Sequence, residues 1–158
     1  MNKRQMIVQG SIAGLIGFAT VAVTLAIVNV VAGRPPLHTA ALLGSALFGG
    51  GEDPSDVALR AGPILGYSVV HLAVFAVFGI AAAALAALAD WGWQLWFVAL
   101  FFFIFISFHL YAAVQALAAP GVGGLSGIVV WTAGFAASLL MAWYLVRSHP
   151  RLRSSQAW

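Results

Sequence analysis

Four long apolar runs, none of which contains an aspartate, glutamate, lysine or arginine, constrain the fold of this chain more than any other feature. They cover about residues 7–31, 63–89, 93–118 and 125–146. Each run exceeds the roughly 20 residues that an α-helix needs to cross the hydrocarbon of a bilayer. Only 7% of the 158 residues are charged, whereas a soluble domain carries about a quarter. The sequence therefore predicts an all-α, polytopic integral membrane protein, with four transmembrane helices in a single domain.

The basic residues predict the orientation of these spans. Lys3 and Arg4 precede the first span, and Arg147, Arg151 and Arg153 follow the fourth, so the two chain ends hold most of the 7 basic residues. An even number of spans places both termini on one side, and the positive-inside rule makes that side the cytoplasm. Because the charges lie at the ends and form no basic face, they indicate topology and not nucleic-acid binding.

The loop 32–62 joins the first two spans on the non-cytoplasmic side. Its first residues, Arg34-Pro35-Pro36, are expected to end the first helix, because a proline cannot donate to the helical hydrogen-bond ladder. The segment 37–48 is apolar but too short to cross a bilayer, so we expect a short interfacial or re-entrant helix there. His38, within this segment, is expected at the membrane interface.

Glycines are spaced regularly along the first span. Gly10, Gly14 and Gly17 bring a GxxxG pattern to one side of the helix. Small residues let a neighbouring backbone approach closely, so this side is expected to pack against a helix of this chain or of a partner. At about 25 residues the run is also longer than the 7–15-residue apolar core of a signal peptide, and we expect it to remain as a span.

Two histidines, His71 and His109, lie inside apolar runs. Counted from the non-cytoplasmic ends of the second and third spans, both imidazoles lie roughly 12–14 Å deep at ~1.5 Å per residue. Polar groups inside a membrane usually turn toward one another. The residues predicted to share this layer with the histidines are Tyr67, Thr24, Trp131 and Thr132.

Three interpretations of this layer stay open. The imidazoles can form hydrogen bonds that fix the packing of the helices. They can act as axial ligands of a b-type haem or of a chlorophyll, since neutral imidazole is a common metal ligand. They can also bind a quinone beside a tyrosine. The short turn between the second and third spans opposes a haem ligated from both, because helices joined in this way normally pack 8–10 Å apart.

The sequence contains no motif of a hydrolase, a nucleotide-binding loop or a metalloprotease, and no cysteine. We therefore expect no catalytic residues and no protein-ligated metal ion. The favoured function is a non-enzymatic accessory subunit of a larger membrane complex, of the respiratory or photosynthetic electron-transfer kind, whose partners are the lipid bilayer and other membrane subunits. One alternative is a small b-type haem- or quinone-binding electron carrier that uses His71 and His109. The other is a small transporter or channel.

Overall fold

A computed structural model describes residues 3–48, 57–89 and 127–148 of the chain. These residues form four helices and no strand: α1 (Lys3–Val31), α2 (His38–Phe48), α3 (Ala61–Ala89) and α5 (Gly127–Ser148). The three long helices are long and apolar enough to cross a membrane, and α2 is a shorter apolar helix. The prediction of an all-α integral membrane protein is confirmed. The span expected at 93–118 lies outside the described residues.

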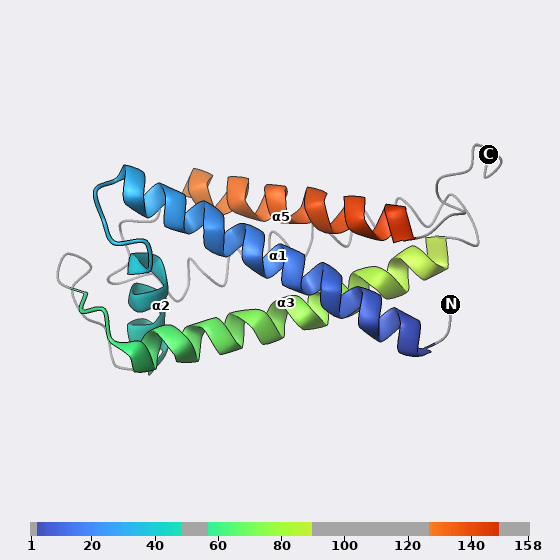
Figure 1. The fold of residues 1–158 in the computed structure, drawn as a ribbon, viewed down its shortest axis with the longest axis horizontal. Coiled ribbons are helices and arrows are strands. Elements are labelled where there is room, and N and C mark those ends of the chain that lie inside the picture. Colours follow the sequence, from blue (N-terminus) through green and yellow to red (C-terminus); the bar gives the residue numbers. More distant parts are fainter. Residues whose placement is uncertain (1–2, 49–56, 90–126, 149–158) are drawn as a thin grey trace.

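The three long helices lie side by side along the molecule (Figure 1). α1 runs in one direction, whereas α3 and α5 run in the opposite direction. α1 packs against both α3 and α5, and those two touch each other little. α2 lies across the end of the molecule at which α1 ends and α3 begins (Figure 1). The short helix expected within 37–48 is therefore present, and it packs mainly against α3.

The helices extend slightly beyond the apolar runs from which they were predicted. α1 already includes Lys3 and Arg4, and α5 continues through Arg147. Hydropathy marks the part of a helix that suits hydrocarbon, whereas the backbone hydrogen bonds continue into the polar interface. The basic residues at both places thus belong to the ends of the helices and not to flanking coil.

A glycine-based cap ends α1. Gly33 has a positive φ of 72°, the conformation that L-residues other than glycine rarely adopt. The backbone N–H of Gly33 donates to the carbonyl of Val30 at 3.0 Å, and that of Arg34 donates to the carbonyl of Asn29 at 2.8 Å. This pair of bonds is the Schellman motif. The two prolines that were expected to end the helix come after this cap, so the helix already ends before them.

α1 and α3 cross with their backbones in contact. A Cβ atom placed on Gly10 would lie 2.8 Å from the backbone nitrogen of Ile80, and one on Gly14 would lie 2.8 Å from the carbonyl carbon of Phe75. From the other side, a Cβ on Gly79 would lie 2.8 Å from the Cα of Gly14. The packing face predicted from the GxxxG pattern is confirmed, and the helix that it meets belongs to this chain.

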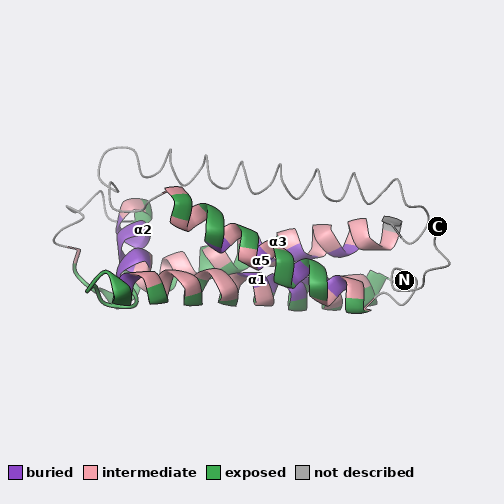
Figure 2. Cartoon of the chain, turned by 90° about the horizontal axis from the view of Figure 1, so that it is seen from above, coloured by how far each residue is buried: buried purple, intermediate pink, exposed green. Residues whose placement is uncertain are grey.

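α5 joins this pair at Gly17. A Cβ on Gly17 would lie 2.6 Å from the Cδ1 of Phe75 in α3 and 2.5 Å from the Sδ of Met141 in α5. The buried residues therefore form a narrow core between the long helices, whose other residues are half-buried or exposed (Figure 2). The core residues are Ala13, Phe75, Ala83, Ala137, Met141 and Leu145.

The first prediction concerns the crossing of α1 and α3. Gly14→Ala is expected to lower the free energy of unfolding by about 1–3 kcal/mol, because the new methyl group would meet backbone atoms that cannot turn aside. The measurement is SDS-induced unfolding in detergent micelles, followed by far-UV circular dichroism. Gly134→Ala is the matched control, since a Cβ there meets no described atom within 4 Å. Equal effects of the two substitutions would contradict the close crossing.

Candidate functional site

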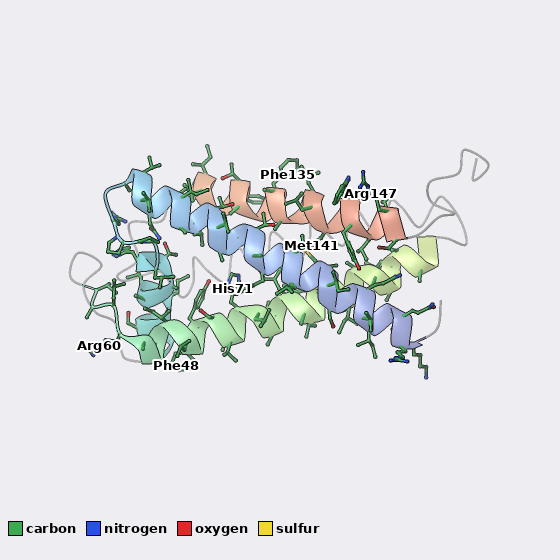
Figure 3. The ribbon with its side chains drawn as sticks, viewed as in Figure 1. Phe48, Arg60, His71, Phe135, Met141 and Arg147 are labelled. Carbon is green, nitrogen blue, oxygen red and sulfur yellow. The ribbon has the colours of Figure 1, made fainter. Side chains whose placement is uncertain are left out.

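His71 lies on α3 and points toward α1 (Figure 3). Three aromatic rings surround its imidazole. The ring centroid of Tyr67 is 5.1 Å away and that of Phe75 is 4.9 Å away, each one helical turn from His71 on the same side of α3. The ring of Phe18, from α1, is 5.3 Å away. We call these four residues the His71 cluster.

The geometry of the His71 cluster is typical of aromatic packing. The imidazole meets Phe18 at an interplanar angle of 66° and Phe75 at 70°, so both contacts are edge-to-face. Such arrangements place the positive edge of one ring against the negative face of another. Because the contacts come from two helices, they hold the imidazole in one orientation between α1 and α3. The cluster offers a fixed ring nitrogen in apolar surroundings, which suits hydrogen bonding or ligation of a flat cofactor.

The structure places the other residues of the predicted layer differently. The Thr24 hydroxyl donates to the carbonyl of Thr20 at 2.8 Å. The Thr132 hydroxyl donates to the backbone carbonyls of Ile128, at 2.9 Å, and of Val129, at 3.0 Å. Trp131 is 41% exposed. Of the predicted set, Tyr67 meets His71, and His109 lies outside the described residues.

A polar site that the sequence analysis did not single out lies at the end of α1. Asn29 is only 4% exposed. Its Nδ2 donates to the carbonyl of Pro36 at 3.0 Å, and its Oδ1 accepts a hydrogen bond from the Thr39 hydroxyl at 3.0 Å. One carboxamide therefore fixes both the turn after α1 and the first residues of α2. We call these three residues the Asn29 clamp.

The sequence did contain a signal for the Asn29 clamp. Asn29 and Gln9 are the two carboxamides within the run 7–31, and Asn29 lies close to its end. A buried carboxamide needs hydrogen-bond partners, because an unpaired one costs about 1–3 kcal/mol. In the sequence the nearest candidates are the backbone groups and hydroxyls that follow α1, and the partners found are the carbonyl of Pro36 in the turn and the hydroxyl of Thr39 in α2.

His38, the first residue of α2, is buried beside the clamp residue Thr39. Its Nε2 is enclosed and has no hydrogen-bond partner among the described residues. Burial lowers the pKa of His38 below its usual value, and the positive charge of Arg34 lowers it further. The imidazole is therefore neutral at neutral pH. The sequence places His38 at the membrane interface and does not predict that its side chain is buried.

Two further hydroxyls of the described spans are bonded within their own helices. Thr20 donates to the carbonyl of Ile16 at 2.7 Å, and Ser68 donates to that of Ile64 at 2.8 Å. Within residues 3–48, 57–89 and 127–148, no three histidine, aspartate or glutamate side chains gather as a metal site would need. The chemistry available in this part of the chain is thus that of the His71 cluster and of His38.

Comparison of the chain with protein-family models, with curated proteins and with solved structures finds no match.

The second prediction concerns the Asn29 clamp. In a double-mutant cycle, Asn29→Ala and Thr39→Val are expected to be coupled by about 0.5–1.5 kcal/mol, because each removes one partner of the same hydrogen bond. Asn29→Ala alone should cost more than Thr39→Val, since it also leaves the carbonyl of Pro36 unpaired. SDS-induced unfolding of the four proteins gives the coupling energy. Additive effects would show that the two side chains act independently.

Proposed function

We propose that the protein is a non-enzymatic subunit of a larger membrane assembly that carries out respiratory or photosynthetic electron transfer. The observation that carries this proposal is the use of the polar side chains in the described spans. The hydroxyls of Thr20, Thr24, Ser68 and Thr132 bond to their own helices, and Asn29 is committed to the clamp. Such polar groups serve the architecture of the helices and leave no reactive set among the described residues.

The same observation disfavours a transporter or channel. A permeation path needs polar groups that point into a common space along the depth of the membrane. The hydroxyls of Thr24 and Thr132 instead donate to carbonyls three or four residues earlier in their own helices. These two hydroxyls are therefore not available to line such a path.

We further propose that both termini are cytoplasmic. Lys3 and Arg4 at the start of α1 lie at the same end of the molecule as Arg147 near the end of α5 (Figures 1 and 3). Arg151 and Arg153 follow α5 in the sequence. The positive-inside rule favours the cytoplasm for the end that carries this excess. Arg34 and Arg60 belong to the connection between α1 and α3, at the other end.

The close packing inside the chain also bears on how a partner can bind. The glycines of α1 are covered by α3 and α5, so they are not available to a second protein. The surfaces left for other subunits are the outward sides of the helices, which carry large aliphatic residues such as Leu65, Val69 and Val77 of α3. These surfaces suit contacts with apolar helices and with lipid chains.

The third prediction tests the subunit proposal. The tagged chain, extracted from its own membrane in a mild detergent, is expected to migrate on native gels in one discrete particle with other membrane proteins in fixed ratio. The same chain expressed alone should be helical and much smaller on the same gel. Mass spectrometry of the band identifies the partners. Identical migration of the two samples would overturn the proposal.

The His71 cluster favours a second candidate function, a small b-type haem- or quinone-binding electron carrier. A side chain that three rings hold between two helices is pre-oriented, as a ligand of a flat cofactor must be. This candidate uses His71 together with His109. A chlorophyll needs a single imidazole and is compatible with the same cluster.

The fourth prediction separates the two candidates. If the chain is a haem carrier, the dithionite-reduced minus air-oxidised spectrum of the purified protein contains a sharp haem band. His71→Ala and His109→Ala should remove that band. His38→Ala is the matched control, because it removes another buried imidazole outside the long helices and should leave the band unchanged. A colourless wild type rules out haem and chlorophyll, and extraction of bound lipid then tests for a quinone.

A further inference from the structure

α5 has two opposite sides with different residues. Its buried side, turned toward α1, repeats every four residues through Ala133, Ala137, Met141 and Leu145. Its outward side repeats with the same spacing, offset by two residues. This outward stripe consists of Phe135, Leu139, Trp143 and Arg147.

The outward stripe is exposed along its length. Phe135 is 66% exposed, Leu139 55% and Trp143 54%. Phe135 and Arg147 both point away from the other helices (Figure 3). The stripe therefore begins with apolar side chains in the middle of the helix and ends with an aromatic residue and a cation near its C-terminus.

Arg147 and Trp143 are in direct contact. The guanidinium carbon of Arg147 lies 4.2 Å from the centre of the Trp143 ring, which is a cation–π geometry. The contact holds the planar guanidinium against the helix and leaves its N–H groups at the edge free to face an anion. A guanidinium fixed in this way is well suited to bind a phosphate, because its donors match the phosphate oxygens in pairs.

The charge at this end of the molecule is also favourable for an anion. Lys3 and Arg4 begin α1 at the same end as Arg147 (Figures 1 and 3). In the sequence one acid, Asp90, directly follows the last residue of α3, whereas Glu52, Asp53 and Asp56 come between α2 and α3. The basic residues outnumber the acid and raise the local concentration of anionic groups.

The length of the stripe fits one leaflet of a bilayer. Arg147 lies twelve positions after Phe135, which at ~1.5 Å per residue is roughly 18 Å along the helix. Half of the hydrocarbon thickness is about 15 Å. A group at Arg147 thus lies at headgroup level when Phe135 lies near the middle of the membrane.

We propose that Arg147 and Trp143 bind the phosphate of an anionic phospholipid, whose acyl chains lie along Leu139 and Phe135. The guanidinium supplies the charge and the paired donors, and the indole fixes the guanidinium. The apolar part of the stripe supplies the surface for the chains. This lipid site needs only the membrane-spanning fold, so it does not depend on the proposed role as a subunit.

The test is native mass spectrometry of the full chain in detergent, titrated with phosphatidylglycerol or with phosphatidylcholine. The wild type is expected to bind phosphatidylglycerol more tightly. Arg147→Gln should weaken that binding about fivefold and weaken binding of phosphatidylcholine less, because the choline cation of that lipid offsets the charge of its phosphate. Trp143→Leu should also weaken it, because the apolar contact remains but the guanidinium is no longer fixed. Both side chains are exposed, so circular dichroism should show unchanged helicity.

Two matched variants show whether the effect is local. Lys3→Gln removes one charge at the same end, and Arg60→Gln removes one at the other end; each should change the affinity for phosphatidylglycerol less than twofold. A loss in Lys3→Gln as large as in Arg147→Gln would overturn the site in favour of a general surface potential. Unchanged binding in Arg147→Gln would also overturn it. Competition by inorganic phosphate as effective as that by the lipid would show a phosphate site and not a lipid site.

Discussion

The contact of backbones where α1 and α3 cross is the constraint on which the rest of the described structure depends. Lipid chains are as apolar as leucine, so helices in a membrane associate mainly through close van der Waals packing. Gly10, Gly14 and Gly79 make that packing possible, because any Cβ at these positions would collide with the facing backbone. Beyond the crossing the two helices diverge toward α2 (Figure 1), and larger side chains fill the space between them. The His71 cluster lies on this diverging side, and its rings fill part of the space between α1 and α3.

The wide end of the α1–α3 pair is held by α2 through two contacts of different chemistry. Gly44 of α2 lies against the backbone of Pro63 at the start of α3. The Asn29 clamp joins the end of α1 to the start of α2 through hydrogen bonds. Close packing needs only small residues, whereas the clamp needs three polar groups in fixed positions. A polar clamp is stable at this end because the turn supplies a partner for the nitrogen of the carboxamide and α2 supplies one for its oxygen.

The sequence was sufficient to predict the features that depend on local pattern. The apolar runs gave α1, α3 and α5, and the shorter run gave α2. The GxxxG spacing predicted that one side of α1 packs closely against another helix, but it could not identify that helix as α3. Depth along a span placed Thr24 and Thr132 level with His71, yet depth does not determine the direction of a side chain around the helix axis, and both hydroxyls bond to their own helices. The burial of His38 and the role of Asn29 depend on how the turn folds back, which hydropathy does not encode.

Two polar side chains in the described structure are held by aromatic rings instead of by hydrogen bonds of the fold. The rings around His71 come from α1 and α3, and the ring beneath Arg147 comes from its own helix. An aromatic ring fixes the orientation of a polar group and still leaves its donors and acceptors available, whereas a hydrogen bond uses them. Asn29 shows the contrast, because both ends of its carboxamide are already bonded. His71, between α1 and α3, and Arg147, near the end of α5, therefore keep groups with which a molecule outside the fold can bind.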